Sequence, residues 1–171
     1  MTRQASRAGR SGFTLIELVV TLALVGVVAM AVLPIYEVVS TRMREAELRV
    51  ALRTIRSALD AYKAAVDSGN IAIQAGESGY PPTLDILVQG VDVGVKNATT
   101  ISGQAAPKRL MFLRQIPRDP FYADATAPPE QTWNTRAYGS PPGDPQPGVD
   151  VFDVSSKSSR IALNGAPYNS W

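Results

Sequence analysis

The feature that most constrains this chain is a run of nineteen residues, 18–36, without a formal charge. As an α-helix rising about 1.5 Å per residue, the run would be roughly 29 Å long, close to the hydrocarbon thickness of a bilayer. Residues 1–12 carry Arg3, Arg7 and Arg10 and no acidic residue. Basic residues on this flank predict that the N-terminal end stays in the cytoplasm and that the rest of the chain is translocated.

Three kinds of membrane segment fit this run: a cleaved secretory signal, a plain anchor, and a membrane segment with an additional role. A secretory signal ends its apolar run at a site of small residues, and Ala29-Met30-Ala31 has that spacing. The helical pattern, however, continues beyond residue 36 without a break. We therefore expect the apolar segment to span the membrane.

Composition excludes most catalytic chemistry. The chain has no His and no Cys, which excludes disulfides, thiolate metal sites, cysteine nucleophiles and every triad built on imidazole. It also has no G-x-S-x-G sequence and no P-loop. The net charge is +2, and the three arginines of residues 1–12 account for more than all of it. We expect neither an enzyme nor a nucleic-acid-binding protein.

Glu17 is the single charge between Phe13 and Tyr36. A carboxylate in an apolar helix costs a few kcal/mol near the membrane centre and less near the interface. Two interpretations follow. Glu17 lies at the level of the lipid headgroups, or it awaits a cation inside the membrane.

Residues 12–18 read GFTLIEL, and this sequence resembles the processing site of type IV pilins and pseudopilins. The resemblance implies that a membrane-embedded prepilin peptidase cleaves between Gly12 and Phe13, removes the basic leader 1–12, and methylates the new amine of Phe13. Glu17 and Pro34 match a glutamate and a proline common in that family.

The chemistry of these residues suits polymerisation. A bare ammonium at Phe13 is as costly in lipid as the carboxylate of Glu17, and each neutralises the other if they meet between neighbouring subunits. Such a pair also sets an axial stagger. Pro34 cannot donate a hydrogen bond to the carbonyl four residues earlier, so we expect the helix to kink or loosen there.

The next segment, residues 37–68, is predicted to continue the helix as an amphipathic half. Its apolar residues recur at spacings of three and four: Leu48, Leu52, Ile55, Leu59, Tyr62 and Val66. We expect this stripe to pack on the chain's own core rather than to form a dimeric coiled coil. Ser68-Gly69-Asn70 predicts the end of a helix that spans residues 13–67.

Residues 69–171 hold twelve of the thirteen prolines and are predicted to form a small globular domain. A short helix is expected at 84–88, a loop at 89–109, and two half-buried strands at 132–138 and 149–154. The predicted fold is therefore α+β: a long N-terminal helix, membrane-spanning in its first half, packed on a small antiparallel sheet. The expected segments are the leader 1–12, the apolar half 13–36, the amphipathic half 37–68 and the domain 69–171.

The domain has a second resemblance, to the major pseudopilin of type II secretion systems. It rests on Tyr80-Pro81, on the sequence IPRDPF at 116–121 and on FDVSS at 152–156. The resemblance implies a structural subunit of a periplasmic fibre that drives protein export across the outer membrane. The implied partners are copies of itself, minor pseudopilins, the prepilin peptidase and the inner-membrane assembly platform. Before assembly the chain would be a single-pass bacterial inner-membrane protein with a periplasmic domain. The alternative is a subunit of a type IV pilus, although many pilins close this region with a disulfide.

Calcium is the one cofactor that this resemblance implies, in the loop after the last strand. Asp150, Asp153 and Ser155 are the candidate ligands, because they offer hard oxygen donors on a turn-rich stretch. Arg160 stands where the family has a further aspartate. In the alternative interpretation no calcium is required. Arg160 then bridges to Asp153, and the domain is held by packing around Trp133, Phe152 and Trp171.

Overall fold

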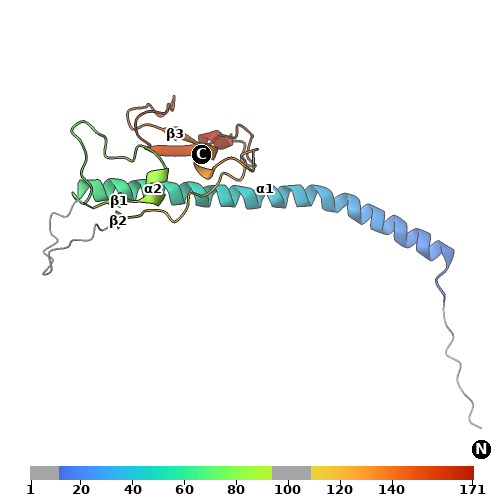
Figure 1. Ribbon diagram of the computed structural model, residues 1–171. Coiled ribbons are helices and arrows are strands. Elements are labelled where there is room, and N and C mark those ends of the chain that lie inside the picture. Colours follow the sequence, from blue (N-terminus) through green and yellow to red (C-terminus); the bar gives the residue numbers. More distant parts are fainter. Residues whose placement is uncertain (1–11, 94–108) are drawn as a thin grey trace, which may run out of the picture. The chain divides into compact units, whose positions relative to one another are not determined.

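The computed structural model describes residues 12–93 and 109–171. The chain divides into two units, one that ends at Thr41 and one from Arg42 to Trp171 (Figure 1). One long helix, α1 (Leu15–Asp67), contributes to both units. Apart from Gly12, the predicted leader lies outside the described residues.

The first unit is the apolar part of α1. The helix begins at Leu15, two residues later than expected, and runs through position 34 without a break in its helical assignment. Its large apolar side chains, as far as the structure describes them, are exposed within the chain, and by length and composition the helix could span a membrane. Such a surface is stable only in lipid or against other apolar helices.

In the second unit, the apolar stripe of α1 is buried as predicted. All six residues of the stripe are at most 7% exposed, so this face packs on the chain's own domain. The helix ends at Asp67, and Gly69 follows with a φ of 74°. The Asn70 amide donates to Ala65 O and the Gly69 amide to Val66 O, the bonding pattern of a Schellman motif.

The short helix α2 (Asp85–Gln89) forms where the sequence predicts one. The segment after it is expected to be a loop from 89 to 109, but the structure has a short strand at each end of this segment. There, β1 (Val91–Asp92) pairs antiparallel with β2 (Arg109–Leu110). Gly90 permits this pairing because its φ is 76° and an added Cβ would lie 2.7 Å from Leu110 O.

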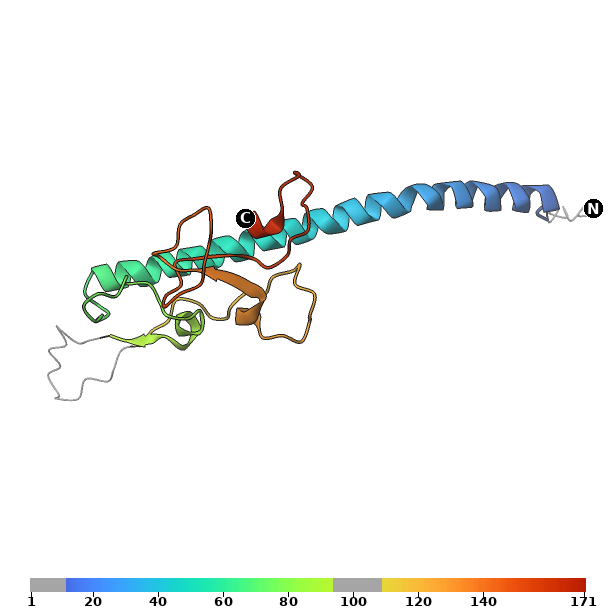
Figure 2. The ribbon, with the colours of Figure 1, turned by 90° about the horizontal axis from the view of Figure 1, so that it is seen from above.

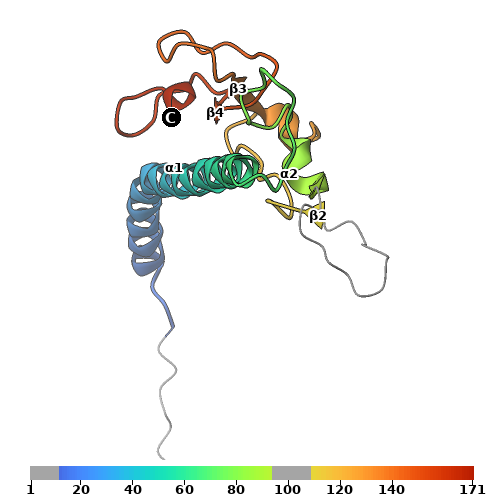
Figure 3. The same cartoon turned by 90° about the vertical axis from the view of Figure 1, so that its left-hand side faces the viewer.

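The second sheet is also two-stranded. β3 (Trp133–Arg136) pairs antiparallel with β4 (Asp153–Ser156), with Trp133 opposite Ser156 and Arg136 opposite Asp153. The 3₁₀ turns η1 (Pro129–Thr132) and η2 (Tyr168–Ser170) precede β3 and follow β4. Figures 2 and 3 show β3, β4 and α2 beside the second half of α1. The fold is α+β, with a pilin-like layout of one long N-terminal helix followed by small antiparallel sheets.

The last strand begins later than the expected 149–154. Val149, Asp150 and Val151 alternate apolar and polar residues, but hydrogen bonds outside the ladder hold this stretch. The carboxylate of Asp150 accepts the Tyr138 amide at 2.8 Å, and the Val151 amide donates to Pro81 O at 2.8 Å. The ladder therefore starts only at Asp153.

A buried polar network holds the 116–121 element in place. Asp119 is 1% exposed, and its carboxylate accepts the Ser156 hydroxyl at 2.6 Å and the Phe121 amide at 2.8 Å. The Asp119 amide donates to the Thr132 hydroxyl, and Trp133 Nε1 donates to Pro117 O. Because each of these buried polar groups has a partner, the network avoids the cost of an unpaired group.

Candidate assembly and processing site

Thr14 and Glu17 build the start of α1. The Glu17 amide donates to the Thr14 hydroxyl at 3.3 Å, and the Thr14 amide donates to the Glu17 carboxylate at 3.5 Å. This reciprocal pair is a capping box, which satisfies two of the free amides at a helix N-terminus. The T-x-x-E spacing at 14–17 could have revealed the cap from the sequence, and it explains why the helix starts at Leu15.

Gly12 and Phe13 lie before the helix in an accessible stretch. Residues 12–14 have no regular secondary structure, and the Phe13 side chain is 83% exposed. An added Cβ at Gly12 would meet no atom within 4 Å. The chain's own fold therefore places no steric demand for glycine here. A requirement for glycine would come from the enzyme that cleaves the chain.

Glu17 lies on an otherwise apolar surface. From Leu18 to Tyr36 no residue carries a formal charge, and the described side chains of this stretch are exposed within the chain. In lipid, the Glu17 carboxylate would have only one capping contact for compensation, the Thr14 amide at 3.5 Å. It therefore has acceptor capacity left for a cation from outside the chain. The side chain of Pro34 lies outside the described residues, although the backbone there is helical.

Residues 7–33 match a known family, the prokaryotic N-terminal methylation motif. The match includes the expected cleavage site at Gly12 and Phe13, and it includes Glu17. The motif indicates a type IV pilin-like or pseudopilin precursor. It is the signal of a structural rather than an enzymatic family, and it implies processing by a prepilin peptidase and polymerisation.

The match covers the N-terminal segment only. No curated protein and no solved structure matches the chain.

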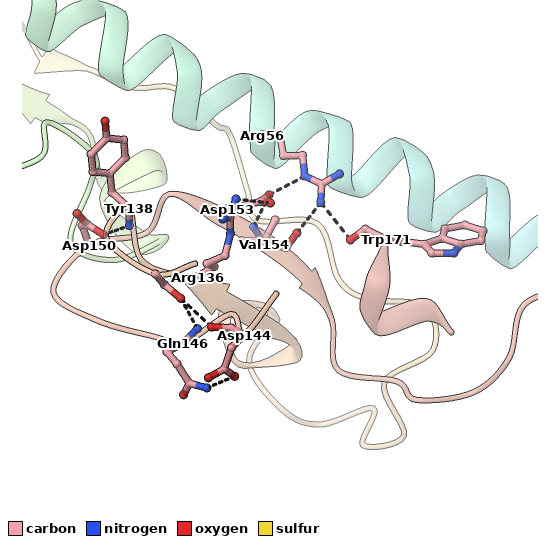
Figure 4. A network of polar contacts seen from close by, with 10 residues as sticks. Arg56, Arg136, Tyr138, Asp144, Gln146, Asp150, Asp153, Val154 and Trp171 are labelled. Carbon is pink, nitrogen blue, oxygen red and sulfur yellow. Dashed lines mark hydrogen bonds and ion pairs between the residues drawn. The ribbon is translucent and has the colours of Figure 1, made fainter. Parts of the chain in front are cut away.

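Two of the three candidate calcium ligands, Asp150 and Asp153, are engaged with protein groups (Figure 4), and Ser155 lies in β4 opposite Asn134 of β3. Asp150 is buried and accepts the Tyr138 amide, as described above. Asp153 accepts Arg56 Nε at 2.7 Å and its neighbour's amide, Val154 N, at 2.8 Å through the same oxygen. Its other oxygen lies 3.5 Å from Arg136 Nη2. Within residues 12–93 and 109–171, no group of three acidic side chains is gathered as a metal site would require. This donor set does not fit calcium.

The expected bridge from Arg160 to Asp153 is wrong. Both ion-pair partners of Asp153 are other arginines, Arg56 of α1 and Arg136 of β3. The Arg160 guanidinium instead lies over the Phe121 ring, 5.9 Å from its centroid. Arg160 is close to Asp153 in sequence, but its side chain turns toward an aromatic surface.

The packing expected around three aromatic residues is present in different degrees. Trp133 is in the core and 2% exposed, and Trp171 packs partly buried against that core. Phe152 is half-buried and makes edge contacts with Tyr80 and Tyr138.

Two residues that sequence reasoning did not single out attach the C-terminal segment to α1. The Glu45 carboxylate, 4% exposed, accepts the Leu163 amide at 2.8 Å and the Tyr168 hydroxyl at 3.0 Å. Arg56 binds Asp153 and two backbone carbonyls. Glu45 lies three residues before Leu48, on the extension of the apolar stripe. A carboxylate at such a position is a signal of a buried polar contact.

Proposed function

We propose that this chain is a structural subunit of a type II secretion pseudopilus, which polymerises through its N-terminal helix to drive protein export across the outer membrane. The observation that carries the proposal is the methylation motif at 7–33, together with a helix that begins at Leu15 and whose described large apolar side chains before Thr41 are exposed. A helix of this kind needs lipid before assembly and other helices after it. The second unit has a core of its own, which suits a domain carried on a fibre.

In this proposal the residues of the N-terminal site have distinct roles. The peptidase cleaves between Gly12 and Phe13 and methylates the Phe13 amine, which leaves 13–36 as the membrane and assembly segment. Glu17 pairs with the amine of a neighbouring subunit in a low-dielectric setting, where an ion pair is strong. Pro34 is the point at which the helix can adjust between bilayer and fibre.

The same proposal gives the chain its place and its partners. Before assembly it is a single-pass inner-membrane protein with a cytoplasmic N-terminus and a periplasmic domain. Its partners are copies of itself, minor pseudopilins, the prepilin peptidase and the inner-membrane assembly platform.

The second candidate function is that of a type IV pilus subunit, major or minor, and the same motif supports it. Two features favour the pseudopilus: the absence of cysteine, and the resemblance of three elements of the domain to major pseudopilins. Two of those elements are central to the packing, since Pro81 and Asp119 are fully buried.

Deletion of the gene separates the two functions. If the chain builds a pseudopilus, the deletion strain retains its exoproteins in the periplasm and keeps its surface pili. Loss of surface pili with normal exoprotein release would favour the pilus subunit instead. The intact mass of the purified protein tests the processing step: we expect a chain that begins at Phe13 and is heavier by one methyl group. A mature chain that begins at Pro34 or later would contradict both functions.

A further inference from the structure

One arginine side chain ties the end of the chain to α1. From the helix, Arg56 donates through Nε to Asp153 Oδ1 at 2.7 Å and through Nη2 to Val154 O and Trp171 O, both at 3.0 Å (Figure 4). These three acceptors come from β4 and from the segment that follows it. We call this group of contacts the guanidinium anchor.

The negative charge of the Asp153 carboxylate is already balanced by neighbouring positive side chains. Two guanidinium groups face one carboxylate, and the three side chains are between 19% and 39% exposed. A calcium ion brought to this carboxylate would meet two positive charges nearby. It would also have to displace Arg56 from Asp153 Oδ1.

Arginine suits this position for a geometric reason. Its guanidinium is planar and presents several donors in a fixed fork, so one group can serve a carboxylate and two carbonyls together. A calcium ion makes a comparable link, since it also binds carboxylate and carbonyl oxygens from separate segments of a chain. The oxygens held here by Arg56, a carboxylate and two carbonyls, are of that chemical type.

We propose that in this chain Arg56 performs the structural role that calcium has in the proteins its domain resembles, so that the C-terminal segment is ordered without metal. The proposal rests on the contacts of Arg56 and Asp153. Its comparison with calcium rests, like the proposed pseudopilus function, on the resemblance of the domain to major pseudopilins, whereas the thermal melts below test the anchor by itself.

The first experiment is a thermal melt of the full-length, detergent-solubilised protein in excess calcium chloride and in excess EGTA. We expect the same Tm in both solutions. A ligand that binds only the folded state raises its stability by mass action, so a higher Tm in calcium would overturn the proposal.

The second experiment tests the anchor itself with a matched pair of variants. Arg56→Lys keeps the charge but loses the fork, and we expect its Tm to fall by about 5 °C in calcium and in EGTA alike. Arg53→Lys is the control, because Arg53 is exposed and its Nε donates only to Arg49 O of its own helix. Equal Tm values for the two variants would overturn the role of Arg56.

A third variant keeps the test decisive if Arg56→Lys does not fold. Asp153→Asn retains the shape and one oxygen acceptor but removes the charge that both arginines contact. We expect a lower Tm that again does not respond to calcium. A Tm equal to that of the wild type would overturn the anchor, and a Tm restored by calcium would overturn the metal-free ordering.

Discussion

At the scale of single residues, Glu17 has two functions that can be separated. Its carboxylate caps α1 together with Thr14, and in the proposed fibre it also pairs with a neighbour's amine. Loss of a cap costs about 0.5–2 kcal/mol of helix stability. Loss of an ion pair in lipid instead affects the association of subunits.

We expect Glu17→Leu to leave membrane insertion and peptidase cleavage intact, because it makes the segment more apolar, and to weaken fibre assembly. Thr14→Val is the control for the cap, since it removes the hydroxyl and keeps the carboxylate. Cleavage is followed by intact mass and assembly by the yield of sheared fibres. Wild-type fibre yield from Glu17→Leu would show that the carboxylate has no part in assembly, and an equal loss from Thr14→Val would assign the effect to the cap.

Tyr168 makes the stability of the second unit depend on pH in the alkaline range. Burial, and then the hydrogen bond to the Glu45 carboxylate, raise the pKa of the Tyr168 phenol above its ordinary value of 10.0. Burial also raises the pKa values of Tyr62 and Tyr80. The unfolded chain then ionises at lower pH than the folded chain. The contribution of these protonated phenols to the free energy of unfolding is fully present below about pH 10. It is lost as pH rises through their raised pKa values.

Urea denaturation at a series of pH values from neutral to alkaline checks this expectation. The free energy of unfolding should be level in the neutral range and should fall above pH 10. Tyr168→Phe should lose about 1.5–3 kcal/mol at neutral pH, because one hydrogen bond to the Glu45 carboxylate is gone, and should show a shallower alkaline fall. An equally steep fall in the variant would mean that Tyr168 does not contribute to it.

At the scale of elements, the face of α1 that packs on the domain is distinct from the face that does not. Leu59 is 1% exposed in the core, whereas Val50, on the same helix, is 54% exposed. We expect Leu59→Ala to cost about 2–5 kcal/mol of unfolding free energy, because it leaves a cavity, and Val50→Ala to cost far less. Urea midpoints at an unchanged m-value provide the measurement. A similar small cost at both positions would show that the stripe is not part of the domain core.

Periodicity explains which elements could be predicted. The stripe of α1 repeats every three to four residues over five turns, so its burial follows from the sequence alone, and Ser68-Gly69-Asn70 marks the end of the helix. The strand expected at 149–154 begins too early because alternation reports only which side chains are apolar. It does not report that Asp150 turns away to bind the Tyr138 amide.

Long-range polar contacts could not be predicted in this way. Arg56 and Asp153 are 97 positions apart, and nothing local to either residue indicates the other. The resemblance offers Arg160 as the partner because it stands where the family has a further aspartate. The fold brings a different arginine to the same carboxylate. The N-terminal site is the opposite case, because its chemistry is contiguous from Gly12 to Glu17.

At the scale of the whole molecule, the second unit contains its entire core. Every buried apolar residue in the described ranges lies between Leu48 and Tyr168. We expect a fragment that begins at Glu37 to be soluble, monomeric and folded. Circular dichroism and size-exclusion chromatography check this expectation. Aggregation of the fragment would indicate that it needs contacts which only the apolar segment or a neighbouring subunit supplies.

The two attachments of the C-terminal segment to α1 also have a mechanical meaning. Glu45 and Arg56 lie eleven residues apart, or about 16 Å along the helix, and each holds a different part of residues 153–171. Tension along the axis of α1 therefore loads both attachments together, in shear, and does not open them one after the other as peeling would. In the proposed fibre, a subunit fastened in this way resists traction along its helix more than force directed across it.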